Sequence, residues 1–462
     1  MRTLGRVVAS LAALTLASAA AAQATTPPAP PAASPGPTPA PAAATAAASS
    51  AAPPDAAAAA PATPEPSGAF RIRSAVLGEE RSFVVLAPPG YATSGRRYPV
   101  VYFTDGSPSL ALLATVTRFL AQNGRMPEVI LVGIDHADRV RDLTPSPGRF
   151  EGAPPAAFKT AGGGDRFLSF LQDELIPHVE RSYRTEPFRM LVGHSLGGLL
   201  AVHAQLARPG LFQATLALAP TLTWNGDEPV RRAREALAGG RGPRGVMVIV
   251  SPNDGPAAAK QAQALVRTVR GASGLQVAAV ELPEEDHGSV VLEGATRGFK
   301  EVFAGWMMPA PAGAVGPGGG LPAVERHYAR LSERLGWTVR PPEPVVDAAG
   351  RQAIRDGKLD DGIRALRQNA AWHPASAAAH DVLGMALVRA DRLEEAKGAF
   401  RTALEVAERA KDPDAAAYRA HLEAATARAP IREALNPTWP GLPNLCGKAG
   451  DRGWEDHHHH GN

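Results

Sequence analysis

The chain has 462 residues, enough for two or three domains of roughly 100–200 residues each. It carries 48 Lys and Arg against 45 Asp and Glu, and this net charge of +3 is too small and too evenly spread for nucleic-acid binding. The single cysteine, Cys446, excludes an intramolecular disulfide and a cysteine-rich zinc site, so apolar cores have to stabilise the domains.

The N-terminus has the pattern of an export signal. Two arginines precede a short apolar run, and three consecutive alanines before Gln23 are the small residues that signal peptidase accepts. We expect residues 1–22 to be a cleaved signal peptide and the mature chain to be exported, periplasmic or secreted. An uncleaved membrane anchor is the alternative, but the run is shorter than the ~20 residues that span a bilayer, and no later stretch suits a span. Residues 23–68, mostly Ala, Pro, Thr and Ser, are predicted to be a disordered linker.

Short β-branched segments alternate with amphipathic helical segments between residues 69 and 308. The predicted strands are residues 82–87, 99–104, 129–134, 190–192, 215–219, 246–250 and 277–282. The predicted helices are residues 166–181, 196–207, 257–269 and 291–306. This alternation predicts an α/β fold with a mostly parallel sheet covered on both faces. Because ligands in such sheets bind at the carboxyl ends of the strands, the residues just after strands are the functional candidates.

An all-helical region follows this α/β part. A proline- and glycine-rich linker over residues 309–343, with one short helix at 324–335, precedes an internal repeat within residues 344–430. Residues 355–361 align with 389–395 at an offset of 34, and the unit resembles the tetratricopeptide repeat, a helix-turn-helix of that length. Two repeats are fewer than such arrays need to stand alone, so we expect docking on the larger domain or on another chain. The face of the helix pairs suits a protein or peptide partner.

The tail, residues 431–462, is predicted to be flexible because it is rich in proline and glycine. The run His457–His460 is interpreted as a remnant of an expression tag or a weak chelator rather than a metal site. Cys446 in the same tail is interpreted as an incidental free thiol, since no helix terminus or base is predicted beside it. No metal or organic cofactor is expected.

The strongest motif is G-x-S-x-G at residues 193–197, where an apolar strand runs into a helix. The nucleophile of this motif lies at a sharp turn, and the two glycines leave room for strand and helix to pass closely. Ser195 is therefore predicted to be a nucleophile, with the Leu196 amide at the helix amino terminus directed at a developing oxyanion. The alternative is a tight turn without chemistry.

A serine hydroxyl needs a base within hydrogen-bond reach. In this type of hydrolase the order along the chain is serine, acid, histidine. His287 is the predicted base, because among the histidines after the serine it lies in a loop just after a predicted strand. Asp254 follows the preceding strand, where the acid that orients the imidazole belongs. Glu284 and Glu285 are rivals for this role, although they are closer in sequence to His287 than is usual.

Four segments resemble the putative-esterase family of α/β-hydrolases, which includes siderophore esterases, feruloyl esterases, S-formylglutathione hydrolases and mycolyltransferases. They are YPVVYFTDG from residue 98, VGID to RVRDLTP from residue 132, GHSLGG from residue 193 and HGSV from residue 287. The resemblance covers about residues 69–308 and implies ester cleavage by an α/β-hydrolase fold. It also implies that the amides of Ser107 and Leu196 form the oxyanion hole, and that Asp105 lies at the mouth of the site and contacts the alcohol part of the substrate.

The string R-x-R-D-L-T-P is most like the bacterial siderophore-esterase branch. The added positive charge with which such enzymes hold anionic catecholates is, however, not evident in the sequence around the site. Arg141 and Asp142 in this string are expected to form a structural ion pair that fixes the loop. Trp224, which follows a predicted strand, is expected either to line the substrate pocket or to anchor the core.

These residues predict an exported serine carboxylic-ester hydrolase that acts on a small-molecule ester through an acyl-enzyme. An acyltransferase using the same three residues is one alternative, distinguished by its products in the presence of acceptor alcohols. A binding or scaffold protein with an inert hydrolase domain is another, and the intact serine and histidine argue against it.

Overall fold

The computed structural model describes residues 67–150, 152–240, 242–309 and 318–427. The predicted signal peptide, most of the predicted linker that follows it, and the predicted tail lie outside these residues. So do Cys446 and His457–His460.

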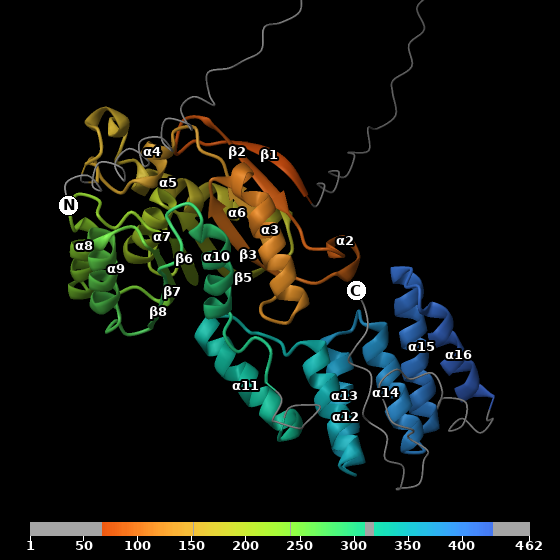
Figure 1. The fold of residues 1–462 in the computed structure, drawn as a ribbon. Coiled ribbons are helices and arrows are strands. Elements are labelled where there is room, and N and C mark those ends of the chain that lie inside the picture. Colours follow the sequence, from red (N-terminus) through yellow and green to blue (C-terminus); the bar gives the residue numbers. More distant parts are fainter. Residues whose placement is uncertain (1–66, 151, 241, 310–317, 428–462) are drawn as a thin grey trace, which may run out of the picture. The chain divides into compact units, whose positions relative to one another are not determined.

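An eight-stranded sheet forms the centre of the α/β part, in the order β1-β2-β4-β3-β5-β6-β7-β8 (Figure 1). The strands from β3 to β8 are parallel to their neighbours, whereas β2 pairs antiparallel with both β1 and β4. The predicted α/β fold with a mostly parallel sheet is confirmed. The strands are β1 Ser67–Arg73, β2 Glu80–Leu86, β3 Tyr98–Thr104, β4 Ile130–Ile134, β5 Thr185–His194, β6 Ala214–Leu218, β7 Gly245–Pro252 and β8 Leu275–Leu282.

Helices cover both faces of this sheet and create two apolar cores. Along β3, Tyr102 belongs to the core shared with α5, α6, α7, α8 and α9, whereas Phe103 belongs to the core shared with α3 and α10. This alternation follows from the two-residue period of a strand. The helices are α2 Tyr91–Ser94, α3 Gly106–Gln122, α4 Arg139–Leu143, α5 Gly164–Phe170, a π-helical turn Leu171–Leu175, α6 Ile176–Ser182, α7 Leu196–Ala207, α8 Glu228–Ala238, α9 Pro256–Val269 and α10 Val290–Val302.

Besides the short helices α2 and α4, three longer elements of this part were not predicted from the sequence. β1 alternates weakly because most of its side chains are exposed, as expected for an edge strand. Helix α3 begins with Gly-Ser-Pro, which has the composition of a turn, although proline is tolerated in the first turn of a helix. Helix α8 is rich in charged residues, and only a narrow apolar stripe marks its inner face.

The C-terminal region is all-helical, as predicted. Its helices are α11 Gly320–Leu335, α12 Glu343–Arg355, α13 Leu359–Trp372, α14 Ala377–Arg389, α15 Leu393–Ala410 and α16 Ala415–Thr426. Helix α12 packs on α13, and α14 packs on α15. The same close contact occurs in both pairs: a Cβ on Gly350 would lie 2.7 Å from Leu366 Cγ, and one on Gly384 would lie 2.5 Å from Phe400 Cε1. Each contact places a small residue of one helix against a large residue of its partner, which gives the sequence repeat a packing basis.

Helix α11 and the segment after it belong to the second core of the α/β part. The rings of Trp337 and Phe188 lie 4.8 Å apart between centroids. Arg334 donates hydrogen bonds to the carbonyl oxygens of Val302, at 2.9 Å, and Ala304, at 2.6 Å. Phe188 lies near the start of β5, and Ser195 follows the end of that strand. The docking contact is therefore at the opposite end of the strand from Ser195.

None of the helices in the described ranges combines the length and the apolar character needed to cross a membrane.

Candidate active site

Ser195 lies at the turn between β5 and α7 with φ 61° and ψ −117°, a conformation that non-glycine residues rarely adopt. The chain on either side of it leaves no room for side chains. A Cβ on Gly193 would lie 2.1 Å from the Gly197 carbonyl oxygen, and one on Gly197 would lie 2.2 Å from Thr104 Oγ1. The glycines of the motif are thus required by the close approach of strand and helix, and the strained turn presents the Ser195 hydroxyl at the sheet edge.

The structure brings Ser195, His287 and Asp254 together at the carboxyl ends of β5, β8 and β7. His287 Nε2 lies 2.9 Å from Ser195 Oγ, and His287 Nδ1 lies 2.8 Å from Asp254 Oδ2. A carboxylate only accepts hydrogen bonds, so Nδ1 carries the proton of the neutral ring and Nε2 is free to accept one from the serine hydroxyl. Of the acids considered from the sequence, Asp254 is the one paired with the imidazole, rather than Glu284 or Glu285.

Asp105 lies directly after β3 in a left-handed conformation, with φ 56°. Its carboxylate accepts two hydrogen bonds from Arg139, with Nε at 2.6 Å from Oδ1 and Nη2 at 3.0 Å from Oδ2. Burial opposes ionisation of Asp105, but the Arg139 guanidinium outweighs it, so the pKa of Asp105 lies below its usual value. Arg139 Nη2 also donates to the carbonyl oxygen of His194, at 3.3 Å, and thereby connects Asp105 to the residue before Ser195.

The two amides expected in the oxyanion hole differ in this structure. Leu196 is the first residue of α7, so its N–H has no acceptor within the helix and lies beside Ser195. The Ser107 N–H instead donates to Asp135 Oδ1 at 2.8 Å, and the Ser107 hydroxyl donates to Asp135 Oδ2 at 2.9 Å. In this structure the Ser107 amide thus has the Asp135 carboxylate as its acceptor, as is favourable at a helix amino terminus, and its role in an oxyanion hole stays a prediction.

Trp224 is a core residue. Its side chain is 0% exposed, its Nε1 donates to Ser146 Oγ at 3.1 Å, and its ring packs edge-on against Phe158 with 5.6 Å between centroids. A ring without accessible surface does not line a pocket, so of the two expectations for Trp224 the pocket wall is wrong and the core anchor is correct.

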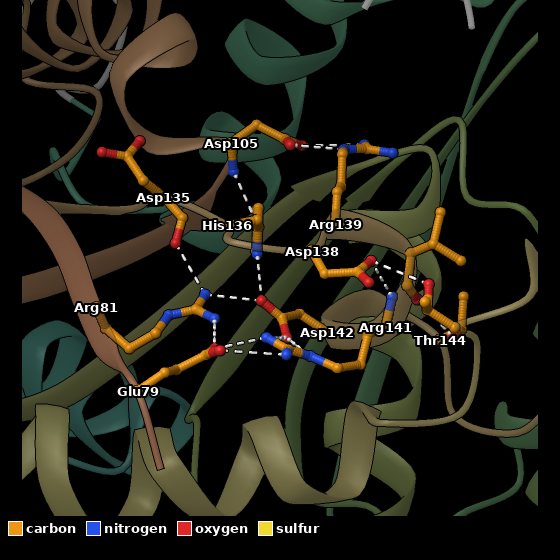
Figure 2. Close-up of polar contacts among 12 residues, drawn as sticks. Glu79, Arg81, Asp105, Asp135, His136, Asp138, Arg139, Arg141, Asp142 and Thr144 are labelled. Carbon is orange, nitrogen blue, oxygen red and sulfur yellow. Dashed lines mark hydrogen bonds and ion pairs between the residues drawn. The ribbon is translucent and has the colours of Figure 1, made fainter. Parts of the chain in front are cut away.

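The expected contact between Arg141 and Asp142 is present, with 2.9 Å between Nε and Oδ1. Figure 2 shows that it is part of a larger network. Asp142 Oδ2 lies 2.7 Å from Arg81 Nη2, and both side chains are 1% exposed. Burial raises the pKa of Asp142, but hydrogen bonds from His136 and Arg81 together with their charge hold it below its usual value. Asp142 of the R-x-R-D string is therefore a buried anchor of the loop after β4.

This network extends to the turn that begins α3. His136 Nδ1 lies 3.4 Å from Asp142 Oδ2, and His136 Nε2 accepts from the Asp105 N–H at 3.3 Å (Figure 2). Arg81 also donates to the carbonyl oxygen of Asp135 at 2.8 Å. Sequence analysis missed Asp135, His136 and Arg139 as neighbours of the site. Their position directly after β4 indicates that they lie near the site, because β4 is the neighbour of β3 in the sheet.

Within the described ranges, no group of three or more His, Cys, Asp or Glu side chains is arranged to hold a metal ion. The groups gathered around Ser195 are a hydroxyl, an imidazole, a carboxylate and a backbone amide.

Comparison with known proteins shows a likeness to esterases. Residues 74–284 match the family model described as "Putative esterase". This part of the chain is similar to that esterase family. The chain is 30% identical over 168 residues to ferri-bacillibactin esterase BesA of Bacillus subtilis, a match that covers 32% of this chain and 56% of BesA. It is 33% identical over 165 residues to a siderophore enterobactin esterase of Emericella nidulans, covering 32% of this chain and 54% of that protein.

Among solved structures, the esterase domain is similar to an IroE-like serine hydrolase from Shewanella oneidensis. The two share 28% identity and a TM-score of 0.58, over 66% of this chain and 99% of that one. An uncharacterised protein from Capnocytophaga ochracea shares the fold, with a TM-score of 0.54 and 17% identity, over 73% of this chain and 93% of that one. The chain spans about half the length of the curated relatives it matches.

Proposed function

We propose that this protein is a serine carboxylic-ester hydrolase. The observation that carries the proposal is the pair of hydrogen bonds made by His287, with Ser195 Oγ at 2.9 Å on one ring nitrogen and Asp254 Oδ2 at 2.8 Å on the other. A histidine held in this way accepts a proton from the serine and is stabilised as an imidazolium by the aspartate.

In the proposed reaction, Ser195 Oγ attacks the ester carbonyl while His287 Nε2 takes the hydroxyl proton. The tetrahedral intermediate collapses, the bond to the alcohol oxygen breaks, and His287 returns the proton to the leaving alcohol. Water then attacks the acyl-enzyme with His287 again as the base, and the carboxylic acid product leaves Ser195. The Leu196 N–H stabilises the negative oxygen in both steps. We propose the Ser107 N–H as a second donor, a role that requires the Asp135 carboxylate to release it.

We propose a siderophore-type ester as the substrate. The support is the similarity to proteins described as siderophore esterases, namely BesA and the Emericella nidulans enterobactin esterase. Arg139, which lies beside the site, is already paired with Asp105 and is therefore not a free cation for an anionic substrate. The substrate class is tested by measuring how fast the purified protein turns over short acyl esters, feruloyl esters and siderophore trilactones. Ser195→Ala is the control. Turnover of short acyl or feruloyl esters alone would contradict it. Added acceptor alcohols reveal acyl transfer in the same assay.

We further propose that the mature protein is exported, because its first residues have the pattern of a cleaved signal peptide. N-terminal sequencing of the protein recovered from the periplasm or medium of an expressing bacterium is expected to begin at Gln23. Recovery of a chain that begins at Met1 from the cytoplasm would contradict export.

A further inference from the structure

A second histidine lies against the base, and the mechanism above does not use it. His194 is the last residue of β5, directly before Ser195. Its Nε2 lies 2.6 Å from the backbone carbonyl oxygen of His287, and the two imidazole rings are 4.9 Å apart between centroids. A carbonyl oxygen only accepts hydrogen bonds, so His194 Nε2 carries a proton and is the hydrogen-bond donor.

The surroundings of His194 keep it neutral and fixed. Burial lowers the pKa of His194 to about 4, and the neighbouring His287 acts in the same direction. Arg139 Nη2 holds the His194 carbonyl oxygen at 3.3 Å, and Arg139 is itself clamped by Asp105, as Figure 2 shows. The main chain of His194 is thus anchored by Arg139, independently of the loop that carries His287.

Apart from those on the Ser195 side, the hydrogen bonds of the His287 loop involve the loop itself or the Asp254 side. Asp286 accepts from the N–H groups of Gly288 and Ser289, which fixes the turn but connects it only to itself. The Asn253 N–H donates to the Glu285 carbonyl oxygen at 2.9 Å and links the loop to the Asp254 side. On the Ser195 side, the loop is linked through its backbone by the bond from His194 and through the His287 imidazole by the bond to Ser195 itself.

We propose that His194 is a positioning residue that holds the backbone of His287 so that the imidazole reaches Ser195. The proposal rests on the proposed function and deepens it. Proton transfer requires a donor-acceptor distance near the 2.9 Å observed between Nε2 and Oγ. A shift of about 1 Å in a catalytic group costs roughly a hundredfold in rate, so a loosened loop lowers kcat without removing any reacting group.

The test compares two substitutions with the same assay. His194→Gln retains an N–H donor of similar reach, whereas His194→Leu removes the donor and keeps an apolar side chain. We expect His194→Leu to lower kcat on a small neutral ester by roughly ten- to a hundredfold with little change in KM, and His194→Gln to stay within a few-fold of the parent. Parent-like kcat for the leucine variant would overturn the proposal. His194→Asn, whose amide is too short to reach His287, replaces the leucine variant if that variant does not fold.

A double-mutant cycle separates positioning from a general structural role. In a His287→Ala background, His194→Leu is expected to leave the residual rate of fluorophosphonate labelling of Ser195 unchanged, because there is no imidazole left to position. An equal loss in both backgrounds would show that His194 acts independently of His287 and would overturn the proposal.

A third measurement does not depend on activity. Amide hydrogen exchange in residues 284–289 is expected to be faster in His194→Leu than in the parent or in His194→Gln, and equal rates in all three would overturn the proposal. If the parent neither turns over esters nor labels in a His287-dependent manner, the proposed function fails while the exchange experiment still decides whether His194 holds the loop.

Discussion

Arg81 of β2 and Asp142 of α4 form an ion pair with 2.7 Å between Nη2 and Oδ2, and both side chains are 1% exposed. Two charges removed from water in this way are costly unless their remaining polar atoms are also bonded. The Arg81 Nη atoms bond to Glu79 and to the carbonyl oxygen of Asp135, and Asp142 bonds to Arg141 and His136, whereas Arg81 Nε has no acceptor among the described residues. The pair therefore anchors the loop after β4, from which Asp135, His136 and Arg139 reach the candidate active site.

Removing Arg81 should destabilise the whole domain. Arg81→Leu leaves Asp142 buried without its charged partner on β2, and we expect a loss of roughly 3–5 kcal/mol in the free energy of unfolding, measured by denaturant titration. Arg71→Leu is the matched control, since the pair of Arg71 with Glu80 has side chains 71% and 54% exposed. Exposed pairs contribute about 0–1 kcal/mol. Equal losses for the two variants would contradict the structural role of the buried pair.

Ser195→Ala should abolish chemistry without changing the fold. The substitution removes one oxygen from a turn whose geometry depends on the glycines around it, so we expect ester turnover to fall at least about a thousandfold. Labelling by a fluorophosphonate probe should disappear, while circular dichroism and the thermal midpoint should match the parent. Labelling of the variant at the parent rate would place the nucleophile elsewhere.

The role of Asp254 is tested by a substitution that removes its negative charge and keeps the shape of its side chain. Asp254→Asn keeps the size of the side chain that faces His287 Nδ1 but favours the wrong tautomer of the imidazole, and we expect kcat to fall by about ten-thousandfold. Glu285→Gln is the control, because the contact of Glu285 with Asn253 involves its backbone carbonyl and survives the substitution. A larger loss for Glu285→Gln than for Asp254→Asn would exchange their roles.

Local sequence patterns could predict some parts of this site and not others. The G-x-S-x-G elbow and the positions of Asp254 and His287 after strands follow from local spacing and from the rule that parallel strands end at one edge. The contact between Asp135 and the Ser107 amide depends on the parallel pairing of β4 with β3 in the folded sheet, and local spacing in the sequence does not specify that pairing. The burial of Trp224 likewise depends on its long-range packing against Phe158.

His194 should make stability depend on pH. Its folded-state pKa of about 4 lies below its usual value of 6.5, so between these values the unfolded chain binds a proton that the folded chain does not. Its contribution is full above about pH 6.5 and falls as the pH falls toward 4. We expect the thermal midpoint to drop less between pH 7 and pH 4.5 in His194→Gln than in the parent. The other histidines are the same in both proteins, so the difference isolates His194, and identical slopes would contradict its lowered pKa.

The last prediction concerns the segment that docks at the far end of β5. A chain ending after Met308 loses α11 and Trp337, and it exposes the apolar surface of Phe188 and Phe303 that these residues cover. We expect that chain to be markedly less stable than the full-length protein, and Trp337→Ala alone to cost roughly 3–5 kcal/mol, the usual range for truncating a buried tryptophan.

A chain ending after Arg340 is the matched comparison, because it keeps α11 and the Trp337–Phe188 contact while it lacks α12 to α16. It should unfold at a temperature between those of the other two chains. Since Ser195 lies at the opposite end of β5 from Phe188, every variant that remains folded should turn over a small soluble ester within a few-fold of the full-length rate. Denaturant midpoints together with small-ester kinetics decide the matter. If the chain ending after Met308 were as stable as the full protein, the docking of α11 would contribute nothing to the fold; if it were folded but inactive, the helical region would have to act on the active site itself.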